Sequence, residues 1–155
     1  INIIYSGTMS AAMEASIEGI HSIGFSLEDY AMDANFDPGT PWIRLIIEHV
    51  LSNGLADSKL LNVNIPHSSL GPIRGMKICR QAEGRWEEEF VEGVDPRGQK
   101  FYWLTGNFAT NDTVEGTDIS ALREGFISIV PSSHDLTHHR AIPALKSLES
   151  IKHIV

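Results

Sequence analysis

Cysteine and positive charge are both scarce in this sequence of 155 residues. A single cysteine, Cys79, cannot form an internal disulfide, so a reducing compartment, the cytoplasm, is expected. Twelve Lys and Arg stand against twenty Asp and Glu, for a formal net charge of −8, which argues against a nucleic-acid polymer as the main partner. A small phosphate ester is not excluded, because a local positive potential at one site is enough to bind it.

Long apolar runs and complete catalytic motifs are also missing. No stretch approaches the length that crosses a bilayer, so no membrane partner is expected. The sequence has no P-loop, no complete G-x-G-x-x-G and no Ser-His-Asp pattern. What remains is 42% hydrophobic and 21% charged, which is the composition of an ordinary globular chain long enough to bury a core.

Helical and strand patterns alternate over the first part of the chain, which predicts βαβ units and a mainly parallel sheet. The predicted elements are a helix after Thr8 that stops at Gly19, a strand over 23–27, a helix over 41–52 with Thr40 as its N-cap, and a strand over 60–66. The second helix is predicted to bury its apolar residues, which are Trp42, Ile43, Leu45, Ile46, Ile47 and Val50.

A β-hairpin is the clearest feature of the second part. Strands over 86–94 and 99–104 flank Asp95-Pro96-Arg97-Gly98, which has the residues of a type I turn. The remaining elements are predicted as strands over 76–80 and 126–131, a loop over 106–116, a short helical turn capped by Asp118, and a terminal helix from Pro143 that carries Leu145, Leu148 and Ile151.

The hairpin is rich in aromatic residues, and a two-stranded ribbon of this kind needs a surface to cover it. It packs either on a second subunit or on the chain's own core, and the residues alone leave both open. Glu87, Glu88 and Glu89 point alternately to opposite faces of a strand, so we interpret them as solubilising charges and not as a cation site.

Ser6-Gly7-Thr8 at a helix start is the segment with the most chemical promise. Free backbone N–H groups and the helix dipole favour an anion there, and two hydroxyls are available as donors. These residues are the candidate phosphate-binding site. Simple capping explains the same residues, since serine and threonine are preferred N-caps.

Two other groups of residues have more ordinary explanations. His134 and His138 have i,i+4 spacing, but the glutamate of H-E-x-x-H is missing and the segment lacks helical periodicity, so solvated loop histidines are favoured over a metal site. Cys79 lies in an apolar strand without a nearby histidine, which favours a buried structural thiol over a nucleophile.

The segment Tyr5-Ser6-Gly7-Thr8-Met9-Ser10-Ala11-Ala12-Met13-Glu14-Ala15 strongly resembles the SurE family of survival phosphatases. Further matches follow in the family's order along nearly the whole chain. They are Leu61-Asn62-Val63-Asn64-Ile65-Pro66, Asp95-Pro96-Arg97-Gly98 with Tyr102-Trp103, Gly116-Thr117-Asp118, the run over 124–131, and Asp135-Leu136-Thr137.

The resemblance implies a three-layer, Rossmann-like α/β core, partial in this chain, with an extended β-hairpin arm and a C-terminal helix. Residues 1–70 are then expected to form the C-terminal part of the core, and residues 71–155 the hairpin, an oligomerisation region and the terminal helix. A homodimer or tetramer through the hairpin 86–104 is implied, with the arm exchanged between subunits.

The same resemblance implies a hydrolase, a 5′-nucleotidase that removes phosphate from nucleoside 5′- and 3′-monophosphates, and polyphosphate as a further substrate. It implies a divalent cation, Mg²⁺, Mn²⁺ or similar, held by an Asn-Asp-Asp-Gly segment, a serine and an asparagine. None of these matches a position within Ile1–Val155, so we expect the metal ligands upstream of Ile1 and no catalytic or metal residue within this chain. Ser6, Gly7 and Thr8 remain as donors to the phosphate. The alternative is a non-catalytic fragment that acts in oligomer assembly or ligand binding.

Overall fold

The computed structural model describes residues 2–110, 112 and 114–151, and for residues 2, 86 and 88 it describes the backbone only. With η for 3₁₀ helices, the elements in chain order are η1 (Asn2–Tyr5), α1 (Gly7–Ile17), β1 (Ser22–Leu27), η2 (Asp37–Gly39), α2 (Thr40–Asn53), β2 (Leu60–Ile65), η3 (Ser68–Leu70), β3 (Met76–Ile78), β4 (Arg85–Val94), β5 (Lys100–Ala109), α3 (Asp118–Arg123), β6 (Ile127–Ser132), η4 (His139–Ala141), α4 (Ile142–Leu145) and η5 (Lys146–Ser150).

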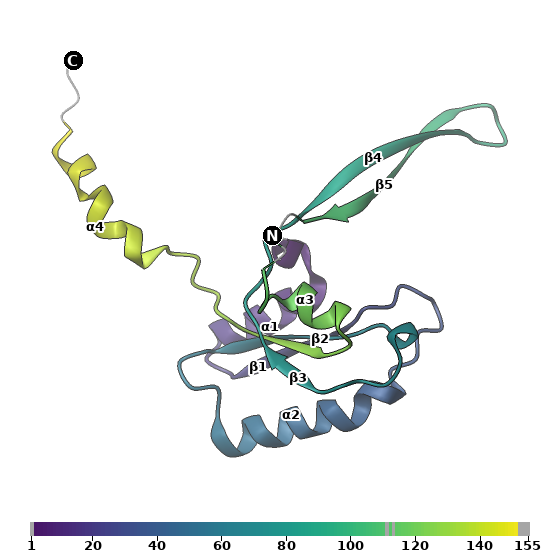
Figure 1. The fold of residues 1–155 in the computed structure, drawn as a ribbon. Helices are drawn as coiled ribbons and strands as arrows, with labels where there is room; N and C mark the ends of the chain where they lie inside the picture. Colours follow the sequence, from purple (N-terminus) through teal and green to yellow (C-terminus); the bar gives the residue numbers. More distant parts are fainter. Residues whose placement is uncertain (1, 111, 113, 152–155) are drawn as a thin grey trace.

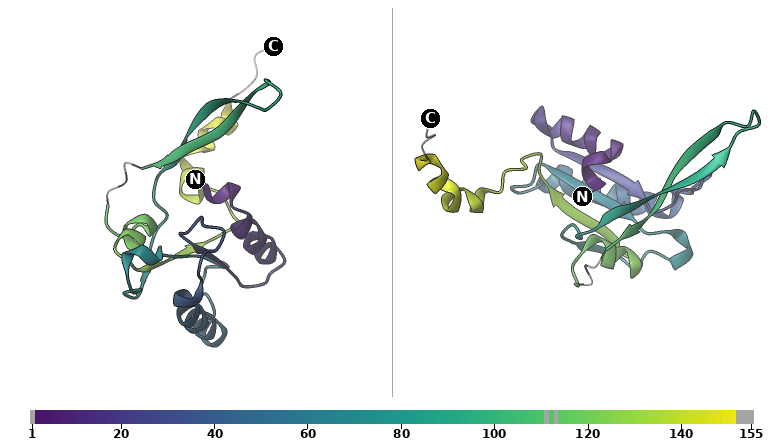
Figure 2. Two further views of the ribbon diagram at one scale, coloured as in Figure 1. Left: turned by 90° about the vertical axis from the view of Figure 1, so that its right-hand side faces the viewer. Right: turned by 90° about the horizontal axis from the view of Figure 1, so that it is seen from above.

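Three layers make up the body of the chain, as predicted. A four-stranded sheet in the order β1-β2-β6-β3 lies in the middle, with α2 on one face and α1 and α3 on the other (Figures 1 and 2). The pairs β1–β2 and β3–β6 are parallel, whereas β2–β6 is antiparallel. The sheet is therefore mixed, because the chain returns from the hairpin through α3 and enters β6 at the carboxyl end of β2.

The main apolar cluster lies between the sheet and α2. It consists of Ile46, Leu55, Leu61, Val63, Ile65, Ile127 and Ile129, with half-buried residues packed around it. Trp42, Ile43 and Val50 of α2 belong to that surround. The prediction was wrong for Leu45 and Ile47, which are 52% and 38% exposed, because a single helix face reaches the sheet.

Two predicted N-caps are shifted by one residue. A 3₁₀ turn precedes α2, so Gly39 is its N-cap and Thr40 is already helical. At α3 the cap is Thr117, whose hydroxyl accepts a hydrogen bond from the Ser120 N–H. Asp118 instead accepts from the Ala82 N–H at 2.9 Å, and this bond ties α3 to the segment after β3.

The β4–β5 hairpin extends away from the three layers (Figure 1). Its turn is as predicted, since the Gly98 N–H donates to the Asp95 carbonyl at 2.9 Å and Gly98 has a φ of +80°. The ribbon is longer than expected, because Arg85 pairs with Ala109 and residues 106–109, predicted as loop, lie in β5. Residues 111 and 113 of that predicted loop lie outside the described residues.

The hairpin's apolar side chains are exposed, Trp103 by 67% and Phe90 by 64%. The ribbon therefore does not pack on the chain's own core, which was one of the two alternatives.

The C-terminal segment also lies apart from the sheet (Figure 2), and it contains a short α4 followed by η5 in place of one continuous helix. Its apolar residues Leu145, Leu148 and Ile151 are exposed as well.

Candidate functional site

The site is built from the start of α1. Ser6 is the N-cap, and its hydroxyl accepts a hydrogen bond from the Met9 N–H at 3.2 Å. The first helical bond runs from the Ser10 N–H to the Ser6 carbonyl at 2.8 Å. Gly7 and Thr8 are exposed, and their N–H groups find no acceptor among the described residues. Two free donors thus point outward at the positive end of a helix dipole.

Packing against the sheet fixes the direction of this helix start. Met9 and Ala12 are buried against Leu60 of β2, and the Ser22 hydroxyl donates to the Ala12 carbonyl at 2.6 Å. Gly24 allows a close approach, since a Cβ there would lie 2.6 Å from the Met9 sulfur. The start of α1 therefore lies over β1, toward its carboxyl end.

Parallel pairing brings the carboxyl ends of β1 and β2 to the same edge of the sheet. The loops that follow these two strands approach each other there, because the Oδ1 of Asp29 lies 3.8 Å from the Nε2 of His67. Tyr30, in the loop after β1, is almost fully exposed. This is the edge at which open α/β sheets place their ligands.

Ser6, Gly7 and Thr8 thus lie together, and their geometry is compatible both with capping of α1 and with phosphate binding. The Ser6 hydroxyl accepts the capping hydrogen bond and still has its O–H as a donor, and the N–H groups of Gly7 and Thr8 are exposed at the helix start. The segment can hold a phosphate group, but it contains no nucleophile activated by a neighbouring base.

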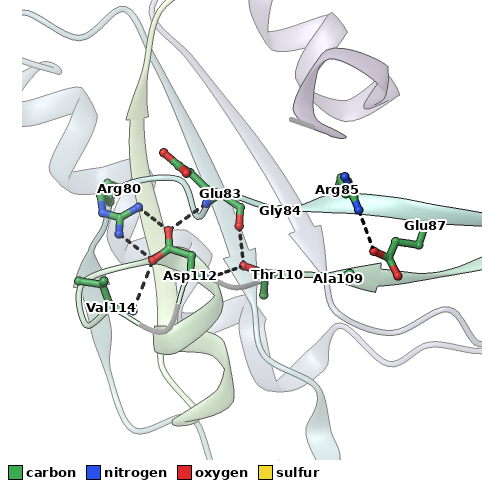
Figure 3. Close-up of a pocket in the computed structure, with 9 residues that line it drawn as sticks. All are labelled: Arg80, Glu83, Gly84, Arg85, Glu87, Ala109, Thr110, Asp112 and Val114. Atoms are coloured by element: carbon green, nitrogen blue, oxygen red, sulfur yellow. Dashed lines mark hydrogen bonds and ion pairs between the residues drawn. The ribbon is translucent and has the colours of Figure 1, made fainter.

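A depression with a volume of about 660 Å³ lies at the base of the hairpin (Figure 3). Arg80 donates two hydrogen bonds to the Asp112 carboxylate, at 2.6 and 2.9 Å, and the Glu83 N–H donates to the same carboxylate at 3.0 Å. These bonds hold the pKa of Asp112 well below its usual range. Because the charges of Arg80 and Asp112 pair with each other, this cluster anchors the base of the hairpin. Few unpaired polar groups are left there to bind a ligand.

The histidine segment after β6 differs in part from the prediction. His134 is half-buried, with its Nδ1 3.0 Å from the hydroxyl of the buried Ser16, whereas His138 is exposed, as predicted. His139 lies 2.6 Å from the Asp135 carboxylate. The Thr137 hydroxyl and then His139 lower the pKa of that carboxyl. Across the part of the chain that the structure describes, no three His, Cys, Asp or Glu residues are grouped so as to hold a metal ion.

Cys79 is buried, as predicted, in a cluster with Ala121 and Val130. Burial raises the pKa of its thiol, which keeps it protonated and unreactive. Glu87 and Glu89 are exposed on the ribbon, in agreement with a solubilising role. None of the helices within the described ranges is long and apolar enough to cross a membrane.

Sequence reasoning passed over two asparagines, Asn62 and Asn64, which occupy alternate positions of the central strand β2. Asparagine is disfavoured in strands, so its repetition inside an apolar pattern was a signal already present in the sequence. It also passed over Asp112, the ion-pair partner of Arg80, because no local pattern in the sequence connects these two residues.

Three comparisons place the chain among known proteins. Residues 1–88 match the family model described as survival protein SurE. Proteins named 5′-nucleotidase SurE from Christiangramia forsetii and Flavobacterium psychrophilum are each 52% identical over 147 residues, which is 95% of this chain and 56% and 57% of theirs. The crystal structure of the SurE protein from Aquifex aeolicus matches with a TM-score of 0.74 and 35% identity, over 96% of this chain and 60% of that one.

The chain thus spans little more than half the length of the curated relatives it matches. The family model covers Ser6-Gly7-Thr8 and the strands β1, β2 and β3, and the structural match covers 96% of the chain.

Proposed function

The chain belongs to the survival protein SurE family, and from this membership we propose that the full-length protein is a 5′-nucleotidase, a hydrolase that removes phosphate from nucleoside 5′-monophosphates. The names of the relatives at 46–52% identity carry this proposal, and they give no support to a non-catalytic fragment. Nucleoside 3′-monophosphates and polyphosphate are proposed as further substrates, and the cytoplasm as the compartment.

In this proposal Ser6, Gly7 and Thr8 bind the substrate's phosphate. The free N–H groups of Gly7 and Thr8 and the Thr8 hydroxyl donate to phosphate oxygens, and the dipole of α1 adds a positive potential. Such donors stabilise charge that grows on the phosphoryl oxygens during transfer. The geometry of the helix start supports this role because the donors are exposed and fixed by a buried first turn.

A divalent metal ion, Mg²⁺, Mn²⁺ or similar, is proposed as the cofactor. The residues within the described ranges do not form a set of ligands that fits it, since no three of their His, Cys, Asp or Glu side chains are grouped suitably. We propose that the ligands of this ion come from a part of the full-length protein outside the described residues.

Phosphate release by the full-length protein tests the activity. The protein is incubated with a panel of nucleoside monophosphates and Mn²⁺ or Mg²⁺, and the assay is repeated with EDTA. Metal-dependent release supports a nucleotidase, whereas no release by a folded sample with any metal refutes it.

The role of Thr8 is tested in the same assay by Thr8→Val, with Thr8→Ser as the matched control. A hydrogen bond to a charged group contributes about 1.5–3 kcal/mol, so Thr8→Val is expected to lower kcat/KM roughly 10- to 100-fold, while Thr8→Ser keeps most of the activity. Equal activity of Thr8→Val and the unmodified protein excludes the hydroxyl from phosphate binding.

We further propose that the hairpin 86–104 joins two or four subunits, with residues 1–70 as part of the core and residues 71–155 providing the assembly region in addition to the core strands β3 and β6. The exposed Phe90 and Trp103 support this, because a two-stranded ribbon that exposes large apolar side chains needs cover. Trp103→Ser with Phe90→Ser is expected to shift the full-length protein to smaller species in light scattering. An unchanged mass would rule out these contacts.

A further inference from the structure

The two faces of the central strand β2 differ in polarity. Val63 and Ile65 point toward α2 and join the apolar cluster. Asn62 and Asn64 point to the opposite face, toward α1 and α3, because successive strand residues alternate. Strand β2 is paired on both sides, and a central strand covered by helices ordinarily carries apolar residues on both faces. Two amides in this position call for a use other than packing.

Polar residues continue across the sheet from Asn64. Its Cα partners are Ser26 of β1 and Ser128 of β6, and directly paired residues point to the same side of a sheet. Ser128 is 0% exposed, and its hydroxyl has no hydrogen-bond partner among the residues that the structure describes. An unpaired buried hydroxyl is costly, which indicates that a further polar group belongs in this row.

The row lies next to the start of α1. Asn62 is the Cα partner of Gly24, and a Cβ on Gly24 would lie 3.3 Å from the Cγ2 of Thr8. Neighbouring strands are about 4.8 Å apart, so Asn62 is one strand spacing from the position that faces Thr8. The phosphate donors and the two asparagines therefore share one face of the sheet.

We propose that Asn64 is a specificity-determining residue that hydrogen-bonds the ribose hydroxyls of the bound nucleoside monophosphate. This rests on the proposed function, in which the phosphate lies at Ser6-Gly7-Thr8. Asn64 donates one N–H to the Oδ1 of Asn62 at 3.2 Å, which orients its amide. The second N–H and the amide oxygen supply a donor and an acceptor, which is what a hydroxyl requires.

The test compares a substrate with ribose against one without it, in the full-length protein. Asn64→Ala is assayed on adenosine 5′-monophosphate and on p-nitrophenyl phosphate. We expect KM for the nucleotide to rise about tenfold, since one or two hydrogen bonds are lost, and KM for the aryl phosphate to change less than twofold. Asn53→Ala is the matched control, because that exposed amide on α2 caps the His49 carbonyl away from the row.

Each other outcome overturns the assignment. An equal loss on both substrates places Asn64 at the phosphate or in the fold, and no change on either removes it from the site. If the unmodified protein hydrolyses neither substrate, the proposed function fails separately, and calorimetry then decides the role of Asn64. Tighter binding of adenosine 5′-monophosphate than of inorganic phosphate, with the difference abolished by Asn64→Ala, supports the assignment. The same affinities in both proteins refute it.

Discussion

Gly24→Ala is expected to disturb the fold and the proposed phosphate site together. The added Cβ would lie 2.6 Å from the Met9 sulfur and 3.3 Å from the Thr8 Cγ2, well inside ordinary contact distance. Met9 is 2% exposed and has little room to yield. Overpacking of this kind costs about 1–3 kcal/mol. In a protein of this size each kcal/mol lowers Tm by about 2–4 °C, so we expect a fall of roughly 2–12 °C.

The same displacement moves the start of α1 and with it the N–H groups of Gly7 and Thr8. A misplacement near 1 Å can lower a rate about 100-fold, so kcat/KM for a nucleoside monophosphate is expected to fall much more than Tm alone suggests. Calorimetry and phosphate release on the full-length protein measure the two effects.

The double variant Gly24→Ala/Met9→Ala tests the cause of that change. Met9→Ala by itself leaves a cavity, but it makes room for the new methyl group. The double variant is therefore expected to be more stable than the sum of the single effects implies. Strictly additive losses, or a Gly24→Ala protein with unchanged Tm and kcat/KM, would refute a steric contact between β1 and α1.

Three further outcomes follow from single side chains. Thr117→Val removes the cap on the Ser120 N–H of α3 and should lower the free energy of unfolding by about 1 kcal/mol in denaturant titration, with Thr117→Ser close to the unmodified protein. Because burial raises the pKa of Cys79, its thiol should react with iodoacetamide far more slowly in the folded than in the unfolded protein, and equal rates would contradict its burial. Arg80 depresses the pKa of Asp112, so this ion pair stabilises the fold above about pH 4, the unfolded value, and the stabilisation is lost as the pH falls further. Asp112→Asn should therefore weaken the dependence of stability on acid pH, followed by circular dichroism, and an unchanged acid titration would show that Asp112 contributes nothing to it.

The sequence predicted the elements of the sheet well because each has a local pattern. The alternation before Pro66, the turn at Asp95–Gly98 and the glycine ends of the helices all depend on neighbouring residues. The predicted N-caps failed at Thr40 and Asp118 by one position, because helix starts are decided by the turn that precedes them.

Contacts between distant residues were beyond local reasoning. The antiparallel pairing of β2 with β6 depends on the path of about sixty intervening residues, and the Arg80–Asp112 pair depends on the closure of the hairpin base. His134 was misread for the same reason, since its partner Ser16 lies at the other end of the sequence. The helix start at Ser6-Gly7-Thr8 was predicted because it is itself a local feature, and its role in phosphate binding stays a prediction.

In our proposal the two faces of the sheet have different roles. The face toward α2 stabilises the fold, and the face that carries the asparagines of β2 binds the ligand. The face toward α2 is uniformly apolar and supplies most of the buried core, so it has no need of a polar residue. The face toward α1 and α3 retains amides and hydroxyls where leucine or valine would pack better, and it adjoins the free N–H groups of Gly7 and Thr8. A sequence that departs from local preference on one face alone, beside an exposed helix start, is best explained by a ligand bound on that face.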